Sequence, residues 1–306
     1  MRKLKKKFCV AMLIFLMFMM SGCTAKIEQN VDSVSDRYSG VVSYLGPEGT
    51  YTEEAVKQFF GENGDYRPQK TVADALQQML DGESTYAVIP QENTIGGPVY
   101  DYVDELLSCE DVHIIGEVEL PIRQALLTAP GSDLDGITTV YSHKQGIIQS
   151  QAWLSENLPQ AEIVEVSSTA EGAKMVAESG AKNLAAIASK GAAEVYGLTI
   201  LAENIQQNED NQTRFYVLAA GSADLSAEGE RMVFSATGAA DDLPELLKQM
   251  DKENMTLISI HDRPEKTRLG QYIYLIECEN RGWNVYQRVS KLDAFSFRYY
   301  GDFSTQ

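Results

Sequence analysis

A threonine and an arginine stand side by side at the end of the segment 208–214, where their side chains could do chemistry together. The hydroxyl of Thr213 can donate a hydrogen bond, and the guanidinium of Arg214 is a planar fork of donors that matches a carboxylate. An apolar run at 215–219 follows and predicts a strand. Spacing alone favours a plainer explanation, an Asn- and Asp-rich turn whose arginine faces solvent or pairs with Glu209.

Four other loops place hydroxyl or amide side chains just before a predicted helix, at 46–52, 92–94, 142–145 and 167–170. Free backbone N–H groups and the helix dipole favour an anion at such a position, although a single loop of this kind is more often a plain N-cap. Such loops gather at one edge of a parallel sheet, where ligands bind. The neutral donors that this reasoning groups around a substrate are Asn93, Thr94, Ser142, Gln145, Ser168 and Thr169.

Strands and helices alternate along residues 41–220, which predicts an α/β domain in two lobes with mainly parallel sheets. The expected strands are 41–45, 86–89, 112–120, 122–128, 138–141, 163–166, 184–188 and 215–219. The expected helices are 53–60, 72–80, 99–107, 147–154 and 172–177.

A small, polar segment at 221–230 marks a domain boundary. Beyond it we expect strand 231–236, helix 241–252, strands 256–261 and 271–278, a helix near 283–289 and strand 293–299. This βαββαβ order is the ferredoxin-like plan and predicts a second domain over 231–306.

The first 22 residues have the pattern of an export signal: five basic residues, an apolar run at 8–20, and then Ser21, Gly22 and Cys23. The ending resembles a bacterial lipobox, in which Cys23 receives lipid, although Met20 stands where Leu is usual. Two alternatives therefore remain: ordinary cleavage of this signal segment without lipidation, or its retention as a short membrane anchor. We expect an exported lipoprotein, anchored on the extracytoplasmic face, with a polar tether over 23–40.

Composition excludes several classes of function. The chain has 306 residues, 44% of them hydrophobic, which is typical of a globular protein. Its net charge is −18, and without residues 1–22 the count is 21 basic against 44 acidic, or −23. A surface this acidic argues against nucleic acid. Cys109 and Cys278 fall in different predicted domains and the three histidines lack metal-ligand spacing, so we expect no disulfide framework and no metal.

Several motifs in one order make residues 41–219 similar to the prephenate dehydratase catalytic domain. They are 44–51 (YLGPEGTY), 88–94 (VIPQENT), 141–145 (YSHKQ), 168–171 (STAE) and the run from 185 to 215 that ends in NQTRF. The resemblance implies decarboxylative dehydration of prephenate to phenylpyruvate, a lyase step of phenylalanine biosynthesis that uses no cofactor. It assigns catalysis to Thr213 and adds Glu92, Arg214 and Phe215 to the substrate-binding residues, with Arg214 as a candidate carboxylate clamp. His143 is a possible proton shuttle, although a bystander role is more usual for such a histidine.

The second domain resembles an ACT domain, the regulatory module of many prephenate dehydratases. Arg263 and Pro264 match the end of its Glu-Ser-Arg-Pro motif, which aligns His261 and Asp262 with the Glu and Ser. Asp241, Asp242 and Leu243 then fall on the Gly-Ala-Leu turn that approaches the effector's carboxylate. Two acidic side chains there imply weak binding of phenylalanine, or none, although they also suit a plain helix cap. The resemblance further implies a homodimer or homotetramer.

The sequence leaves two other functions open. An exported, two-lobed α/β protein is also typical of a solute-binding receptor, here for an aromatic or prephenate-like carboxylate that is bound without turnover. The third hypothesis is a sensor that uses only the second domain.

Overall fold

The computed structural model describes residues 38–222 and 229–305. The expected signal segment, Cys23 and the tether as far as residue 37 lie outside the described residues. In the part of the chain that is described, no helix has both the length and the apolar character needed to cross a membrane.

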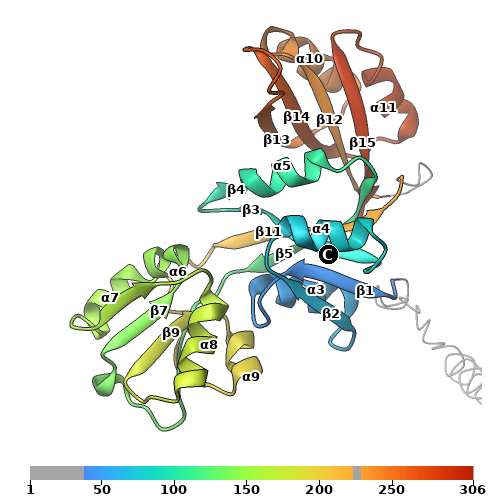
Figure 1. Ribbon diagram of the computed structural model, residues 1–306. Coiled ribbons are helices and arrows are strands. Elements are labelled where there is room, and N and C mark those ends of the chain that lie inside the picture. The colour runs from blue at the N-terminus through green and yellow to red at the C-terminus, as the bar shows by residue number, and fades with distance from the viewer. Residues whose placement is uncertain (1–37, 223–228, 306) are drawn as a thin grey trace, which may run out of the picture. The chain divides into compact units, whose positions relative to one another are not determined.

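The first sheet has the strand order β2-β1-β3-β11-β5, with the short β4 beside β3 (Figure 1). Its strands are β1 (Val41–Leu45), β2 (Asp65–Gln69), β3 (Tyr86–Asn93), β4 (Gly97–Pro98), β5 (Val112–Pro121) and β11 (Gln212–Ala220). Its helices are α3 (Tyr51–Phe60), α4 (Val72–Leu80) and α5 (Tyr100–Ser108). Thr50 and Thr71 accept hydrogen bonds from backbone N–H groups in the first turns of α3 and α4, which fixes where both helices begin.

The second sheet has the order β10-β6-β9-β7-β8. Its strands are β6 (Ala125–Thr128), β7 (Thr139–Ser142), β8 (Glu162–Glu165), β9 (Leu184–Ala188) and β10 (Thr199–Glu203). The associated helices are η1 (Leu134–Gly136), α6 (Lys144–Gln149), α7 (Gln151–Asn157), α8 (Thr169–Ser179) and α9 (Lys190–Tyr196). Small side chains, Ala173, Ala186 and Ala192 among them, let α8 and α9 pack closely on the buried strands.

The chain passes between these two sheets twice, at 122–124 and at 204–211, and the two crossovers are hydrogen-bonded to each other. Ile122 donates its backbone N–H to Asn211 at 2.8 Å, and Ile205 donates to Gln124 at 3.0 Å. The second crossover leads directly into β11. The start of β11, with Thr213, is therefore held beside both sheets.

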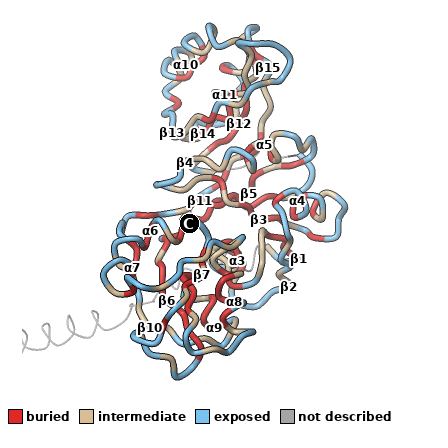
Figure 2. The backbone as a smooth tube through the Cα atoms, turned by 60° about the vertical axis from the view of Figure 1, so that its left-hand side comes forward, coloured by how far each residue is buried: buried red, intermediate tan, exposed pale blue. Residues whose placement is uncertain are grey.

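The third sheet, β13-β14-β12-β15, is antiparallel throughout. Its elements are β12 (Arg231–Ala239), η2 (Ala240–Asp242), α10 (Leu243–Lys252), β13 (Leu257–Pro264), β14 (Gln271–Glu279), α11 (Trp283–Val289) and β15 (Phe295–Phe303). Leu246 of α10 and Val289 of α11 pack with Phe234 on one face. On the other face Tyr300 and Phe303 belong to a core shared with the first sheet. Figure 2 shows buried stretches along β11, β5 and β12. The third sheet thus has a core with its own helices on one face and shares a core with the first sheet on the other.

Three expectations about the elements need correction, and several elements were not expected. The strand expected at 122–128 begins at Ala125, because residues 122–124 form the first crossover. The sheets are mixed and not mainly parallel, because β11 runs antiparallel to β3 and β5, and β6 runs antiparallel to β9 and β10. The helix expected at 147–154 is two helices that meet at Ser150. The edge strand β2 and the short elements α9 and β10 had no clear periodic signal; β2 is largely exposed and forms by pairing with β1.

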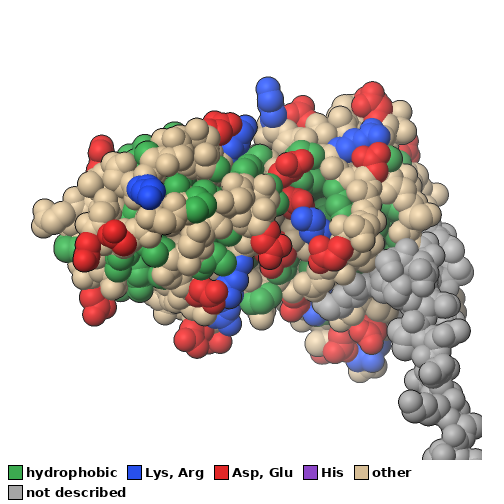
Figure 3. All heavy atoms as spheres, turned by 90° about the horizontal axis from the view of Figure 1, so that it is seen from below, with side chains coloured by type: hydrophobic (Ala, Val, Ile, Leu, Met, Phe, Trp, Pro, Cys, Tyr) green, Lys and Arg blue, Asp and Glu red, His purple; other side chains and the backbone are tan. Residues whose placement is uncertain are grey.

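The surface carries both signs of charge. On the face drawn in Figure 3, acidic side chains lie at many separate points with basic ones between them, and no continuous basic patch is visible. Such a face offers no track for a phosphate backbone.

Candidate functional site

A cavity of about 440 Å³ brings together loops of the first and second sheets. Six of the predicted site residues line it: Asn93, Gln145, Ser168, Thr169, Thr213 and Phe215. They come from β3, α6, the start of α8 and β11, so segments up to 122 positions apart in the chain meet here. A volume of this size suits a small molecule.

The hydroxyl of Thr213 is oriented by Asn93. The amide nitrogen of Asn93 donates to Thr213 Oγ1 at 2.9 Å. Its amide oxygen accepts from the backbone N–H groups of Ile95 and Gly96, at 3.0 and 2.9 Å, so the amide cannot be turned around without losing both bonds. One lone pair of Thr213 is therefore occupied by a donor, and its hydrogen stays available to the cavity.

Two helices point their first turns at the cavity. Thr50 caps α3 and lines the cavity together with Tyr51 and Thr52. Ser168 caps α8, accepting from Glu171 N at 3.0 Å, and Thr169 follows it. Backbone N–H groups at both helix starts carry partial positive charge. They give the cavity a preference for anions that does not require a cationic side chain.

His143 lines the cavity but acts as the N-cap of α6. Its Nδ1 accepts from Gln145 N at 3.3 Å. The side chain thus helps to begin α6, which carries Gln145 and Gln149 into the cavity.

Two predicted substrate ligands hold the site together and do not line the cavity. Ser142 is fully buried and donates to Ile187 O at 2.8 Å, and a Cβ on Gly146 would lie 2.6 Å from its hydroxyl. Thr94 Oγ1 accepts from Gln212 N at 2.8 Å and lies 3.2 Å from Asn211 Oδ1. Ser142 therefore secures the approach of α6, and Thr94 secures the turn that precedes Thr213.

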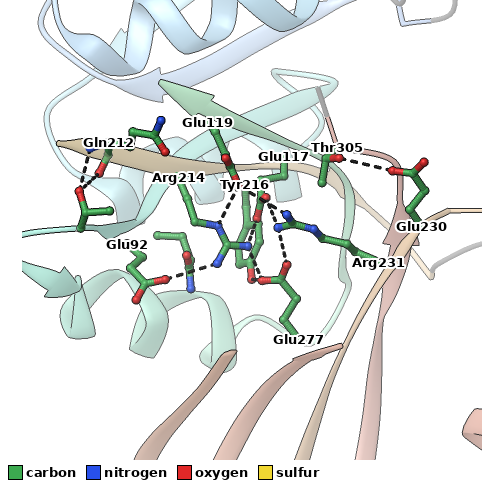
Figure 4. A network of polar contacts seen from close by, with 12 residues as sticks. Glu92, Glu117, Glu119, Gln212, Arg214, Tyr216, Glu230, Arg231, Glu277 and Thr305 are labelled. Atoms are coloured by element: carbon green, nitrogen blue, oxygen red, sulfur yellow. Dashed lines mark hydrogen bonds and ion pairs between the residues drawn. The ribbon is translucent and has the colours of Figure 1, made fainter. Parts of the chain in front are cut away.

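Arg214 is placed differently from the expected carboxylate clamp. Its guanidinium is not part of the cavity lining; it donates to Glu117, to Glu277 at 2.5 Å and to Glu92 at 3.3 Å (Figure 4). Alternation along β11 explains this, because consecutive side chains point to opposite faces of the sheet and Thr213 faces the cavity. Glu92 is engaged in the same network and does not line the cavity either.

Glu117 and Glu277 are fully buried carboxylates that share two arginines. Arg231 donates to Glu117 at 2.7 Å and to Glu277 at 2.9 Å, from the side opposite Arg214 (Figure 4). Burial and the neighbouring carboxylate of Glu277 raise the pKa of Glu117 to about 7, against the lowering effect of the two arginines. The cluster ties β5 and β11 of the first sheet to β12 and β14 of the third.

Gln149 and Gln124 are site residues that the sequence reasoning did not select for substrate contact. Both line the cavity, and both are at least nine-tenths buried. Gln149 stands four residues after Gln145 on a helical segment, a spacing that puts the two on one face and could have identified it. Gln124 lies in the first crossover, where no local pattern indicates a cavity.

Four of the six residues expected at an effector site divide into two groups. Leu243 and Asp262 line a separate pocket of about 300 Å³ with Ala240 and two tyrosines of β14. His261 is buried against Gln91, with 2.8 Å between the two side-chain nitrogens, and Arg263 donates to both oxygens of Asp104 at 2.5 and 2.8 Å. The last two therefore contact β3 and α5, not the pocket.

Asp241 and Asp242 lie in η2, just before α10, and neither makes a side-chain capping bond. The helix cap, which was the alternative explanation for these two residues, therefore has no side-chain hydrogen bond, although both carboxylates stand at the helix start. In the described ranges, no group of three or more His, Cys, Asp or Glu side chains is arranged to hold a metal ion.

Comparisons with known proteins agree with these motifs. The family model described as prephenate dehydratase matches residues 42–223. A bifunctional chorismate mutase/prephenate dehydratase of Aquifex aeolicus is 36% identical over 253 residues, which are 82% of this chain and 68% of that protein. A prephenate dehydratase of Methanocaldococcus jannaschii is 35% identical over 259 residues, 82% of this chain and 93% of that protein.

A comparison with solved structures agrees with these sequence matches. The crystal structure of a prephenate dehydratase from Arthrobacter aurescens, in complex with L-Phe, superimposes with a TM-score of 0.78 at 29% identity and covers 86% of this chain and 90% of that one. The chain spans about two thirds of the length of its bifunctional relatives, from 64% to 68%. The sequence resemblance is thereby confirmed, and the chain belongs to the prephenate dehydratase family.

Proposed function

We propose that the chain catalyses the decarboxylative dehydration of prephenate to phenylpyruvate, and that the 440 Å³ cavity is the active site. The observation that carries this proposal is the hydrogen bond from Asn93 to Thr213. It leaves the Thr213 hydroxyl as a donor with a fixed position, at the edge of a cavity lined by neutral donors. Family membership supplies the substrate and the reaction.

The reaction needs one proton and a donor at the leaving oxygen. As the ring carboxylate departs as CO₂, the electron pair of its C–C bond enters the ring, and the C–O bond on the opposite carbon breaks towards oxygen. The departing hydroxide takes up one proton and leaves as water, and the ring becomes aromatic. A hydrogen bond from Thr213 to that oxygen strengthens as negative charge develops, an effect typically worth a hundredfold or more in rate.

Neutral donors suit this chemistry better than a cation. Among the described residues that line the cavity none is Lys or Arg. The substrate's two carboxylates would be bound by the first turns of α3 and α8 and by amide side chains such as Gln145. An arginine against the carboxylate that is lost would stabilise the substrate more than the transition state. The engagement of Arg214 by glutamates is consistent with that requirement.

The decisive experiment follows phenylpyruvate formation from prephenate by the purified protein without its signal segment. We expect turnover in the wild type, a decrease in kcat of at least about tenfold in Thr213→Val with little change in KM, and substantial retention in Thr213→Ser. Valine keeps the shape of the side chain and removes only the hydroxyl. A wild type that binds prephenate yet releases no phenylpyruvate would instead support the solute-binding alternative.

We also propose that the third sheet and its helices form an ACT-type regulatory domain. The βαββαβ order and the 300 Å³ pocket at the start of α10 support this. The ion pair from Arg263 to Asp104 provides a contact with α5, whose residue Tyr102 lines the proposed active site. The effector would be an amino acid that binds weakly.

The arrangement and location of the protein are further proposals. Two sheets joined by two crossovers support a two-lobed catalytic domain like that of periplasmic binding proteins. The sequence of residues 1–23 supports a lipoprotein signal and an extracytoplasmic lipid anchor at Cys23. A homodimer or homotetramer is proposed from the resemblance alone.

A further inference from the structure

Two buried amide side chains are hydrogen-bonded to each other at the wall of the cavity. Gln124 is 2% exposed and Gln149 is 5% exposed. The amide nitrogen of Gln124 donates to the amide oxygen of Gln149 at 3.0 Å. Buried amide groups of this kind need defined partners, because an unmatched donor or acceptor in such a place is unfavourable.

The partners of Gln124 determine the direction of this bond. The single hydroxyl hydrogen of Tyr51, on α3, is shared between two acceptors, Arg123 O at 2.7 Å and Gln124 Oε1 at 3.2 Å. The backbone N–H of Gln124 donates to Gln206 Oε1 at 2.9 Å, which fixes the crossover that carries the side chain. With its oxygen towards Tyr51, Gln124 presents its nitrogen to Gln149.

The consequence falls on Gln149. Its oxygen is occupied by Gln124, and its nitrogen has no hydrogen-bond partner among the described residues. Since Gln149 lines the cavity, that nitrogen is left as a donor for a ligand.

We propose that Gln124 is a positioning residue, which holds Gln149 with its amide nitrogen towards the cavity so that it donates to a carboxylate or carbonyl oxygen of the substrate. This deepens the proposed function and rests on it. A glutamine does not titrate, so the direction of the Gln149 amide is independent of pH. Gln124 acts through Gln149 and does not itself react.

The test is Gln124→Glu, which keeps the shape of the side chain and makes its donor titratable. An ionised carboxylate only accepts, so Gln149 must turn its nitrogen towards it and its oxygen towards the cavity, against an anionic substrate. A protonated carboxyl donates again and restores the original direction. Burial raises the pKa of a carboxyl, which brings this titration towards the neutral range.

We expect the KM for prephenate in Gln124→Glu to be near the wild-type value at low pH and to rise by roughly tenfold or more at high pH, with a smaller change in kcat. The titratable and charged groups near Gln124 are Tyr51 from α3, His143 and Tyr102 on the cavity lining, and Arg123 beside it in the chain. Dividing each KM by the wild-type KM at the same pH removes the effect of the titration of these groups. The exposed Gln151→Glu is the matched control for added charge and should follow the wild type.

A second measurement is independent of turnover. The side-chain amide signals of Gln149, assigned by their loss in Gln149→Leu, should shift with pH in ¹⁵N-glutamine-labelled Gln124→Glu and stay constant in the wild type. A wild type that forms no phenylpyruvate overturns the proposed activity but leaves this readout intact. Signals that do not titrate, or a KM that does not depend on pH, overturn the positioning role.

If Gln124→Glu does not fold, Gln124→Met replaces it. Methionine neither donates nor accepts strongly, so Gln149 is released from its fixed direction. KM should then rise at every pH, and an unchanged KM in the folded variant overturns the proposal.

Discussion

Arg214 of β11 donates a hydrogen bond of 2.5 Å to Glu277 of β14, so the strand that carries Thr213 is tied directly to the third sheet. Glu117 accepts from the same guanidinium nitrogen, and the side chains of both glutamates are fully buried. Two carboxylates in such a place require compensation by cations and donors.

Loss of that compensation should be strongly destabilising. We expect Arg214→Ala to lower the free energy of unfolding by about 3 to 5 kcal/mol, because it leaves buried charge unpaired. Denaturant unfolding measures this directly. Arg67→Ala, which removes an exposed pair with Asp65, should change it by less than about 1 kcal/mol. Equal small losses in the two variants would mean that the buried network contributes nothing.

The raised pKa of Glu117 makes stability depend on pH in a definite direction. Between the ordinary value of 4.5 and about 7, the folded protein keeps a proton that the unfolded chain has released. The free energy of unfolding should therefore fall as pH rises through this window, by about 1.4 kcal/mol for each unit of pKa displacement.

Glu117→Gln removes this contribution, so its unfolding free energy should change less between pH 5 and pH 8 than that of the wild type. Chemical denaturation at four pH values gives the comparison. The exposed Glu156→Gln should show the wild-type slope. Parallel curves for Glu117→Gln and wild type would contradict the assignment.

The orientation of Thr213 should depend on the amide nitrogen of Asn93. In Asn93→Asp one oxygen still accepts from Ile95 and Gly96, but the other accepts a hydrogen bond and draws the Thr213 hydrogen away from the cavity. We expect kcat to fall by at least about tenfold. Asn208→Asp, whose oxygen keeps its bond from Asp210 N, should be close to wild type. An unchanged kcat in Asn93→Asp would refute the role given to this hydrogen bond.

Phenylalanine should bind weakly to the proposed regulatory domain. Asp262 lines the pocket, and Asp241 and Asp242 stand at the helix start, so carboxylates meet the carboxylate of an amino acid. Calorimetric titration should give a Kd above about 1 mM, which corresponds to a binding free energy weaker than about −4 kcal/mol. Replacing Asp241 and Asp242 together by Gly and Ala should tighten binding, whereas the exposed Asp251→Ala should not. Tight binding by the wild type would show that the acidic turn does not exclude the effector.

Export should depend on the first 23 residues. We expect the wild type in the membrane fraction after processing and Cys23→Ser in the soluble extracytoplasmic fraction, because a lipid chain supplies the membrane affinity. Fractionation with immunoblotting separates these outcomes. The conservative Cys109→Ser, far from the signal in sequence, should fractionate like the wild type. An unprocessed wild type in the cytosol would contradict the lipoprotein proposal.

The sequence by itself determined the family and most of the element order, and it selected Thr213, which lines the cavity. Helix α4 and strand β9 have the expected bounds, because hydrophobic period and N-caps are local properties that survive in almost any tertiary context. The motifs at 92–94 and 211–215 identified Asn93 and Thr213 together, although 120 positions separate them.

Only the tertiary structure decided what those residues contact. Arg214 looked like a substrate ligand until β5 and β14 brought Glu117 and Glu277 to its side of the sheet. The contacts of Gln124 could not be predicted locally, since they depend on α3 and α6 reaching one crossover from different parts of the chain. Side-chain contacts across such separations are set by how sheets pack, and strand pairing that places β11 antiparallel between β3 and β5 is not encoded in the pattern of any single strand.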